Sequence, residues 1–235
     1  MEVYDGVLGQ KFIKMIRQLP NPMLLDMGCG DGLRLFPLLD RHGTLHAVGV
    51  DTSLKSLRRA LKRSDEKGIK DRVDFILGDA NLMPIKDGAF NCGLVISVLY
   101  LIRSLSPIAE LHRVTKGVVL IREKTFNPVT ARAFYSVLNN RLVIYILGRL
   151  GSGGSFHGSY YLTASLLKKE LLEAKFEIIR QKPIYYIPIP KNLFNIYPQS
   201  LSHFLLRILS RIEDCIKDIP ILKKYIVGWT LLCYS

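Results

Sequence analysis

The chain has 235 residues, of which 49% are hydrophobic and 23% charged, so it can bury a core and is not a disordered chain. Its 33 lysines and arginines against 20 acidic residues give a net charge of +13. This charge favours an anionic partner such as nucleic acid, an acidic lipid surface or an anionic substrate, although many basic domains simply keep a solvated cationic face.

Neither a signal peptide nor a membrane-spanning segment is predicted. The first five residues are acidic and lack the apolar stretch of a signal peptide. The longest uncharged apolar run, residues 94–102, is far shorter than the ~20 residues needed to span a bilayer. The four cysteines form no zinc-binding pattern with the histidines, so we expect no metal site and reduced thiols. We therefore expect a cytoplasmic protein, with a membrane-peripheral location as the alternative.

The first half of the chain alternates amphipathic helices with short apolar strands. In chain order, the pattern predicts a helix at about 6–19, a strand at 23–27, a helix from 33 to about 41, a strand at 45–50, a helix capped by Ser53 to about 67, strands at 73–77 and 93–98, a helix at 107–114 and a strand at 117–122. This alternation indicates βαβ units and a mostly parallel sheet with helices on both faces.

The second half departs from this alternation. A helix is predicted from Asn127 to about 150, followed by a glycine-rich loop, and we interpret residues 127–158 as a substrate-side insertion. Further elements are predicted at 163–174 (helix), 176–179 and 183–187 (strand with its extension), 199–217 (amphipathic helix) and 225–234 (last strand). No linker separates two domains, so we expect residues 1–235 to form one domain.

The strongest motif is a glycine-rich turn at residues 26–32, Asp-Met-Gly-Cys-Gly-Asp-Gly, directly after the first apolar strand. Gly28, Gly30 and Gly32 let the backbone turn sharply and approach a ligand closely. The following helix start offers free N–H groups and a partial positive charge, which favour a carboxylate or a phosphate.

The spacing of the glycines in this motif argues against a dinucleotide and favours a different adenosyl cofactor. A nicotinamide fingerprint reads G-x-G-x-x-G, whereas here the pattern is G-x-G-x-G and Leu33 stands where that fingerprint has its last glycine. Asp51 ends the second strand, where its carboxylate can accept hydrogen bonds from ribose hydroxyls. Asp79 follows the third strand, where it can accept from an adenine amino group while the Ala80 N–H donates to the ring.

With these motifs in order, the sequence resembles the class I, S-adenosylmethionine-dependent methyltransferases, in particular the branch that includes quinone-biosynthesis and other small-molecule methyltransferases. The matching stretches are residues 24–32, 48–53, 75–85, 90–98 and 110–117. The resemblance implies a Rossmann-like seven-stranded sheet, mostly parallel with an antiparallel last strand. It also implies S-adenosylmethionine as the cofactor and S-adenosylhomocysteine as the product.

The resemblance also implies roles for single residues. Asp26 would organise the glycine loop and reach the cofactor's amino group directly or through water, and Asp51 would bind the ribose. The remaining cofactor-binding residues would be Gly28, Cys29, Gly30 and Gly32 at the methionine part, Thr52, Asp79 and Ala80 at the adenine, and Ser97 and Val98 near the sulfonium. Leu99-Tyr100-Leu101 replaces the aromatic or histidine pair often found after the fourth strand, which weakens any inference about the acceptor.

The sequence also offers candidate residues on the acceptor side. If a general base is needed, His157 on its glycine-flanked loop is the first candidate and Glu123, after the fifth strand, the second. Candidates to line the acceptor pocket are Tyr100, Tyr135, Tyr160 and Tyr161. The plainer interpretation of His157 is a loop histidine without a catalytic role. The plainer interpretation of the tyrosines is that they belong to the core. The helix at 199–217 carries basic residues beside an apolar face, which suits a membrane surface but more often packs on the protein's own sheet.

The sequence therefore predicts methyl transfer to a small-molecule or lipid-like acceptor, on an O, N or C atom that it does not identify. The basic charge keeps an RNA or protein methyltransferase open as the alternative, although the motifs of amino-methylating and pyrimidine C5-methylating nucleic-acid enzymes are missing from the sequence. A non-catalytic cofactor-binding protein is a further alternative, and the three acidic residues at the strand ends argue against it. A nicotinamide oxidoreductase is least favoured. The oligomeric state is not predicted.

Overall fold

The computed structural model of the protein describes residues 4, 6–102, 104–125, 162–184 and 228–235. Within them, the helices are α1 (Val7–Arg17), α2 (Phe36–Arg41), α3 (Leu54–Glu66), α4 (Ser106–Val114) and α7 (Ala164–Glu173), with short 3₁₀ helices η1 (Lys70–Arg72) and η2 (Leu99–Leu101). The strands are β1 (Met23–Met27), β2 (His46–Asp51), β3 (Val73–Leu77), β4 (Phe90–Ile96), β5 (Thr115–Lys124), β6 (Glu177–Ile184) and β7 (Gly228–Tyr234).

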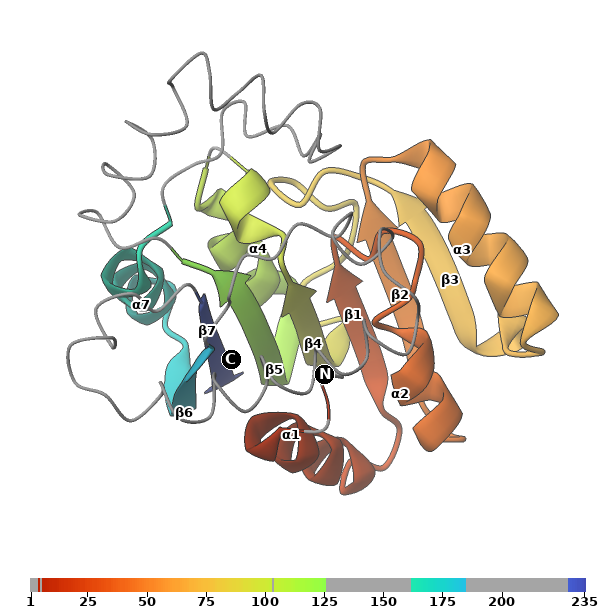
Figure 1. Ribbon diagram of the computed structural model, residues 1–235, viewed down its shortest axis with the longest axis horizontal. Coiled ribbons are helices and arrows are strands. Elements are labelled where there is room, and N and C mark those ends of the chain that lie inside the picture. The colour runs from red at the N-terminus through yellow and green to blue at the C-terminus, as the bar shows by residue number, and fades with distance from the viewer. Residues whose placement is uncertain (1–3, 5, 103, 126–161, 185–227) are drawn as a thin grey trace, which may run out of the picture.

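These strands form one seven-stranded mixed sheet in the order β3-β2-β1-β4-β5-β7-β6 (Figure 1). The five strands from β3 to β5 pair in parallel, whereas β7 runs antiparallel to both of its neighbours, β5 and β6. The sheet grows outward from β1 in both directions, which is the arrangement that places a ligand site at the carboxyl ends of the central strands. The predicted Rossmann-like sheet, mostly parallel with an antiparallel last strand, is confirmed.

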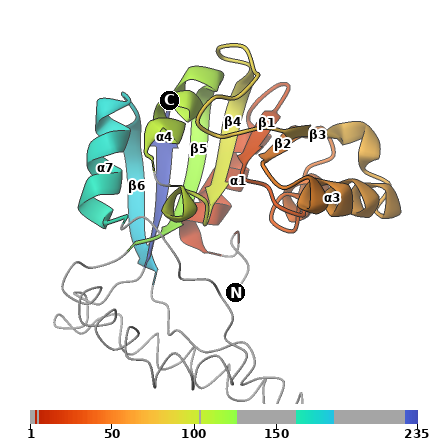
Figure 2. The same ribbon diagram turned by 90° about the horizontal axis from the view of Figure 1, so that it is seen from above.

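Each face of the sheet carries its own apolar core, because successive residues of a strand point to opposite faces. Leu24 and Leu94 belong to the core that α1 and α2 cover. Leu25 and Val95 belong to the opposite core, which α4 and α7 cover. Figures 1 and 2 show these helices on the two sides of the sheet. Burial on both faces explains why the central strands read as continuous apolar runs in the sequence.

Local signals fix several helix ends. Ser53 Oγ accepts a hydrogen bond from the Ser56 N–H at 3.2 Å, so the predicted Ser53 cap is confirmed. Thr163 Oγ1 accepts one from the Leu166 N–H at 3.1 Å and caps the helix predicted at 163–174. Helix α2 begins at Phe36, three residues later than predicted, because the N–H groups of Leu35 and Phe36 first close a turn onto the Gly32 carbonyl.

Strand β4 also differs from its predicted bounds of 93–98. It begins at Phe90, which pairs with Thr115 of β5, and it ends at Ile96. The next residue, Ser97, has a φ of 58°, so the chain leaves the extended conformation there.

Part of the prediction concerns residues that the structure does not describe. The predicted helices at 127–150 and 199–217 and the predicted insertion at 127–158 lie outside the described residues. Within the described ranges, no helix combines the length and the apolar composition required to cross a bilayer.

Candidate functional site

Four neighbouring parallel strands end at the same edge of the sheet. Met27 at the end of β1 pairs with Val50 of β2 and with Val95 of β4, and Asp51 at the end of β2 pairs with Leu77 at the end of β3. The loops that follow these strands therefore start side by side. Two of the predicted cofactor-binding residues, Asp26 and Asp51, lie in the strands. These loops carry all the others.

The glycine loop after β1 is bound tightly to the neighbouring strand. The N–H groups of Gly28 and Cys29 both donate to the Val50 carbonyl, at 2.8 and 3.1 Å. Gly28 has a φ of 74°, and a Cβ added to it would lie 2.4 Å from Val98 Cγ2, so only glycine lets the loop pass the turn after β4. Gly30 also has a positive φ, of 57°, but a Cβ on it would meet no atom within 4 Å. The loop is thus packed closely against the turn after β4 at Gly28 and is open at Gly30.

Cys29 contributes its backbone to this loop, because its side chain points into the protein. The thiol is buried, and burial, reinforced by the carboxylates of Asp26 and Asp51, raises its pKa far above the ordinary value. Its Sγ would lie 2.7 Å from a Cβ added to Gly49 of β2, so the two residues are in close contact. Gly32 closes the loop with its N–H on the Cys29 carbonyl at 3.0 Å.

The carboxylate of Asp51 joins the glycine loop to the start of α3. Its Oδ2 accepts from the Gly30 N–H and its Oδ1 from the Ser53 N–H, both at 2.8 Å. A second link is ionic, since Arg63 of α3 contacts the Asp31 carboxylate at 2.6 Å. These contacts fix the orientation of the Asp51 carboxylate, and the second lone pair of each oxygen remains to accept from hydroxyl groups.

Asp26 is a carboxylate enclosed by the protein. It lies in β1 with 2% of its surface exposed, and its Oδ2 accepts no hydrogen bond from the described part of the chain. Burial, and next the negative charge of Asp51, raise the pKa of Asp26 to about 7. A buried carboxylate in this state favours a cationic partner, because an opposite charge would offset its desolvation.

The residues after β3 extend the same edge. The Gly78 N–H donates to the Asp51 carbonyl at 3.1 Å, so Asp79 begins its loop beside the end of β2. Asp79 and Thr52 are exposed, whereas Ala80 is buried against the core that α4 covers. Gly30, Asp51 and Asp79, which carry the predicted contacts to the cofactor, therefore lie on three adjacent strand ends.

The turn after β4 is held by a side chain from β5. Ser97 donates its N–H to the Arg122 carbonyl at 2.8 Å. Glu123, which is 1% exposed, accepts at Oε1 from the N–H groups of Val98 and Leu99, at 2.8 and 3.1 Å. The structure thus brings Ser97, Val98 and Glu123 together, and it shows Glu123 fixing the backbone of the turn. Whether Glu123 also acts as a base stays a prediction.

The residues predicted on the acceptor side are mostly outside the described ranges. His157, Tyr135, Tyr160 and Tyr161 all lie there, and their roles stay predictions. Tyr100 is described; it is half-buried and packs against the core beneath α4 and α7. This position agrees with the plainer interpretation of Tyr100 as a core residue and leaves its predicted substrate contact untested.

Three residues that support the site were not singled out from the sequence. Asn81 bonds to the Asp79 carboxylate, and Glu110 and Arg113 of α4 bond to the loop between β3 and β4. The one available signal was the spacing of Glu110 and Arg113, since residues three apart on a helix lie on one face. Nothing in the local sequence predicts their contacts with a loop about 25 to 30 residues away.

The part of the chain that forms these strand ends is also the part that is similar to known proteins. Residues 24–117, less than half of the chain, match a family model described as a methyltransferase domain. A methyltransferase named ungE' from Aspergillus campestris is 34% identical over 68 residues, which are 29% of this chain and 20% of that protein. A demethylmenaquinone methyltransferase from Renibacterium salmoninarum is 28% identical over 163 residues, 66% of this chain and 62% of that protein. The chain thus spans less than two thirds of either relative.

A solved structure extends the similarity over nearly the whole chain. The crystal structure of geranyl diphosphate C-methyltransferase from Streptomyces coelicolor A3(2), in complex with Mg²⁺, geranyl diphosphate and S-adenosyl-L-homocysteine, superposes with a TM-score of 0.63. The match covers 96% of this chain and 77% of that one, at 14% sequence identity. At this identity the similarity concerns the fold.

We predict that Asp26→Asn stabilises the ligand-free protein at pH 8. The folded-state pKa of about 7 lies above the ordinary 3.8, so the wild-type carboxyl group lowers stability increasingly from about pH 4 to pH 7 and fully above it. The shift corresponds to at most about 4 kcal/mol, and we expect about 2–4 kcal/mol of gain at pH 8, shrinking toward pH 4. Urea denaturation at several pH values measures this; exposed Asp74→Asn is the control. Equal stabilities at every pH would refute the prediction.

We predict that Glu123→Ala lowers the free energy of unfolding by about 2–4 kcal/mol, because it removes the acceptor of two N–H groups. Glu123→Gln keeps an oxygen at the same place and should cost less than about 1 kcal/mol. Chemical denaturation of both variants compares them. A Gln variant as unstable as the Ala variant would show that the two backbone contacts are not what Glu123 contributes.

Proposed function

We propose that the chain is a class I, S-adenosylmethionine-dependent methyltransferase that transfers a methyl group from this cofactor to a small-molecule or lipid-like acceptor. The observation that carries the proposal is the grouping of Gly30, Asp51 and Asp79 on three adjacent strand ends. A glycine loop open to a ligand and two carboxylates beside it supply what an adenosyl amino acid requires. The loop offers close approach, and the carboxylates accept from hydroxyl and amino groups.

The buried Asp26 supports the fit of the amino-acid part of the cofactor. A carboxylate with 2% exposure and an Oδ2 that no described group hydrogen-bonds is unfavourable in the free protein. An ammonium group placed near it would lower its pKa again and satisfy that oxygen. Asp26 would thus bind the cofactor's amino group, directly or through water, while the open backbone at Gly30 accommodates the neighbouring atoms.

The adenosine part would be held by Asp51, Asp79 and Ala80. Asp51 is oriented by two backbone N–H groups and retains lone pairs for the ribose hydroxyls. Against a dinucleotide, the structure adds a packing argument to the spacing of the motif. Leu33, at the position of the third fingerprint glycine, is 58% exposed, so it does not serve the close helix–strand packing for which that glycine is required.

When bound, S-adenosylmethionine supplies an activated methyl group, whose carbon forms a bond to the acceptor's electron pair as its bond to sulfur breaks and S-adenosylhomocysteine leaves. The protein's contribution is alignment and exclusion of water. Glu123 fixes the Ser97–Leu99 turn by two hydrogen bonds and so defines one wall of the site. If the acceptor must lose a proton, we propose His157 first and Glu123 second as the group that takes it.

Two observations support a small-molecule or lipid-like acceptor. The relative that aligns over 163 residues is a demethylmenaquinone methyltransferase, and the geranyl diphosphate C-methyltransferase shares the fold over 96% of this chain. We propose Tyr100, Tyr135, Tyr160 and Tyr161 as candidates for the acceptor pocket, and a location in the cytoplasm or at a membrane surface. The net charge of +13 supports RNA or protein as the alternative acceptor.

Cofactor binding is the first test. We expect S-adenosylmethionine and S-adenosylhomocysteine to raise the melting temperature and NAD to leave it unchanged, since a ligand that binds only the folded state stabilises it by mass action. Asp51→Ala should abolish the shift, and Asp71→Ala, an exposed acid in η1, should keep it. A shift with NAD alone, or none with any of the three, would refute the proposed cofactor.

Acceptor class is the second test. We expect methyl-labelled S-adenosylmethionine to transfer its label to an added demethylmenaquinone or prenyl diphosphate, and not to bulk tRNA or protein. Asp51→Ala is the inactive control. Label recovered in tRNA, in a reaction that weakens steeply with salt, would favour the alternative.

For Glu123→Gln, a turnover rate that no longer rises with pH would support Glu123 as the base, whereas an unchanged pH profile assigns it to the turn alone.

A further inference from the structure

Helix α4 holds the loop between β3 and β4, residues 78–89, at two separate places. This loop carries Asp79 and Ala80, the proposed adenine-binding residues. Near the end of α4, Arg113 contacts the middle of the loop. At the beginning of α4, Ser106 contacts Asn81 near the start of the loop. The two contacts differ in what they fix, and the difference can be tested.

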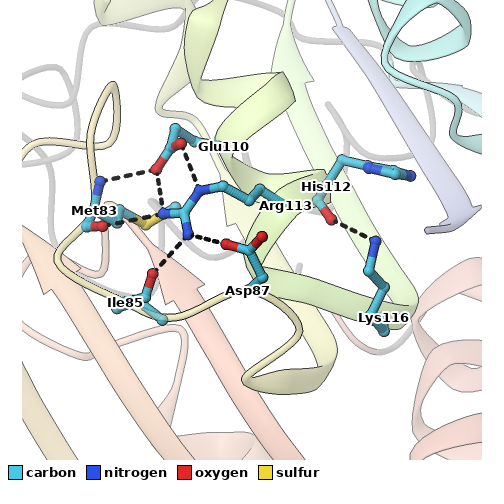
Figure 3. Close-up of polar contacts among 7 residues, drawn as sticks. All are labelled: Met83, Ile85, Asp87, Glu110, His112, Arg113 and Lys116. Atoms are coloured by element: carbon cyan, nitrogen blue, oxygen red, sulfur yellow. Dashed lines mark hydrogen bonds and ion pairs between the residues drawn. The ribbon is translucent and has the colours of Figure 1, made fainter.

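The middle of the loop is fixed by the Arg113 clamp, made of Arg113, Glu110, Met83, Ile85 and Asp87 (Figure 3). The guanidinium donates to the carbonyls of Ile85 and Met83, at 2.7 and 3.2 Å, and to Asp87 at 2.6 Å. Glu110 binds the guanidinium twice at 2.8 Å and accepts from the Met83 N–H at 3.0 Å. The hydrogen bonds from Arg113 hold the pKa of Glu110 below its ordinary value, so the clamp is ionised at neutral pH. It fixes the path of the loop as a whole.

The start of the loop is fixed by the side chain of Asn81. Its Oδ1 accepts from Ser106 Oγ, at the beginning of α4, at 2.5 Å. Its Nδ2 donates to Asp79 Oδ1 at 2.7 Å, and the Asn81 backbone N–H donates to the same oxygen at 2.8 Å. Asn81 is half-buried, whereas Asp79 and Ser106 are exposed, so the amide is the inner member of the chain of contacts. It connects the orientation of Asp79 to the position of α4.

These contacts treat the two oxygens of Asp79 differently. Oδ1 accepts two N–H groups, while Oδ2 accepts none from the described residues. The Ala80 N–H, next in the chain, likewise has no acceptor among them. A free acceptor beside a free donor matches an adenine edge, in which an amino group adjoins a ring nitrogen. A hypoxanthine edge presents a carbonyl oxygen to Asp79 instead, and two acceptors oppose each other there.

Resting on the proposed function, we propose that Asn81, anchored by Ser106, is a positioning residue that turns Asp79 Oδ2 toward the purine amino group and so sets selectivity for adenosyl over inosyl ligands. Without the Asn81 amide, Asp79 keeps one of the two donors to Oδ1 and can rotate. Rotation weakens a contact that only the amino-bearing ligand makes. The loss therefore falls on one ligand and spares the other.

The experiment measures dissociation constants of S-adenosylhomocysteine and of S-inosylhomocysteine by calorimetry, for wild type and variants. We expect wild type to favour the adenosyl ligand at least about tenfold. In Asn81→Ala the adenosyl ligand should bind about three- to tenfold more weakly, while the inosyl ligand changes less than about twofold. Ser106→Ala should shift the ratio in the same direction by less.

Two further variants separate positioning from a general effect on the loop. Arg113→Lys weakens the clamp and should affect both ligands alike, leaving their ratio unchanged. Asn21→Ala, an exposed asparagine before β1, should leave both constants unchanged. An Asn81→Ala variant that weakens both ligands equally, or a wild type that does not distinguish them, overturns the inference. Failure of wild type to bind either ligand would instead overturn the proposed function.

Discussion

The carboxylate of Asp51 is the constraint on which the site depends. One oxygen holds the glycine loop at Gly30 and the other holds the first residue before α3, Ser53. The parallel register of β1, β2 and β3 brings these groups within reach, and the Arg63–Asp31 ion pair reinforces the same connection. The residue proposed to bind ribose is therefore also the residue that shapes the loop around it. Under this proposal, one side chain would couple ligand binding to the local structure of this edge.

Much of this edge could be predicted because its signals are local. Strands β1 and β3 have the bounds that their mostly apolar segments predict, since a glycine, Gly28 or Gly78, follows each segment directly. Ser53 and Thr163 mark the starts of their helices, because each hydroxyl accepts a hydrogen bond from an N–H group only three residues later. Once a parallel sheet is predicted, the residues after its strands must share an edge. The sequence alone could for this reason place Asp26, Asp51 and Asp79 at one edge of the sheet.

The rest depends on contacts between distant parts of the chain. The delayed start of α2 follows from a turn on Gly32, and the early start of β4 follows from the pairing of Phe90 with Thr115, neither of which a helical or apolar pattern shows. Glu123 reads as an acid at a strand end, and only the fold shows that it holds the turn of β4. Asn81 and Arg113 are ordinary loop and helix residues until α4 is packed beside the loop. The acceptor-side residues at 127–161 lie outside the described ranges.

In the proposed site, Asp26 would provide affinity for a ligand at the expense of stability. Its neighbours in β1 are apolar and buried, so an apolar residue would suit its position better than a carboxylate does. A pKa of about 7 means that the free protein resists ionising this group at neutral pH, and the nearby charge of Asp51 increases the resistance. A cation that enters beside both carboxylates removes the two unfavourable terms together. In the proposed complex, the binding free energy would include the relief of this desolvation and repulsion, so binding and folding would be linked at Asp26.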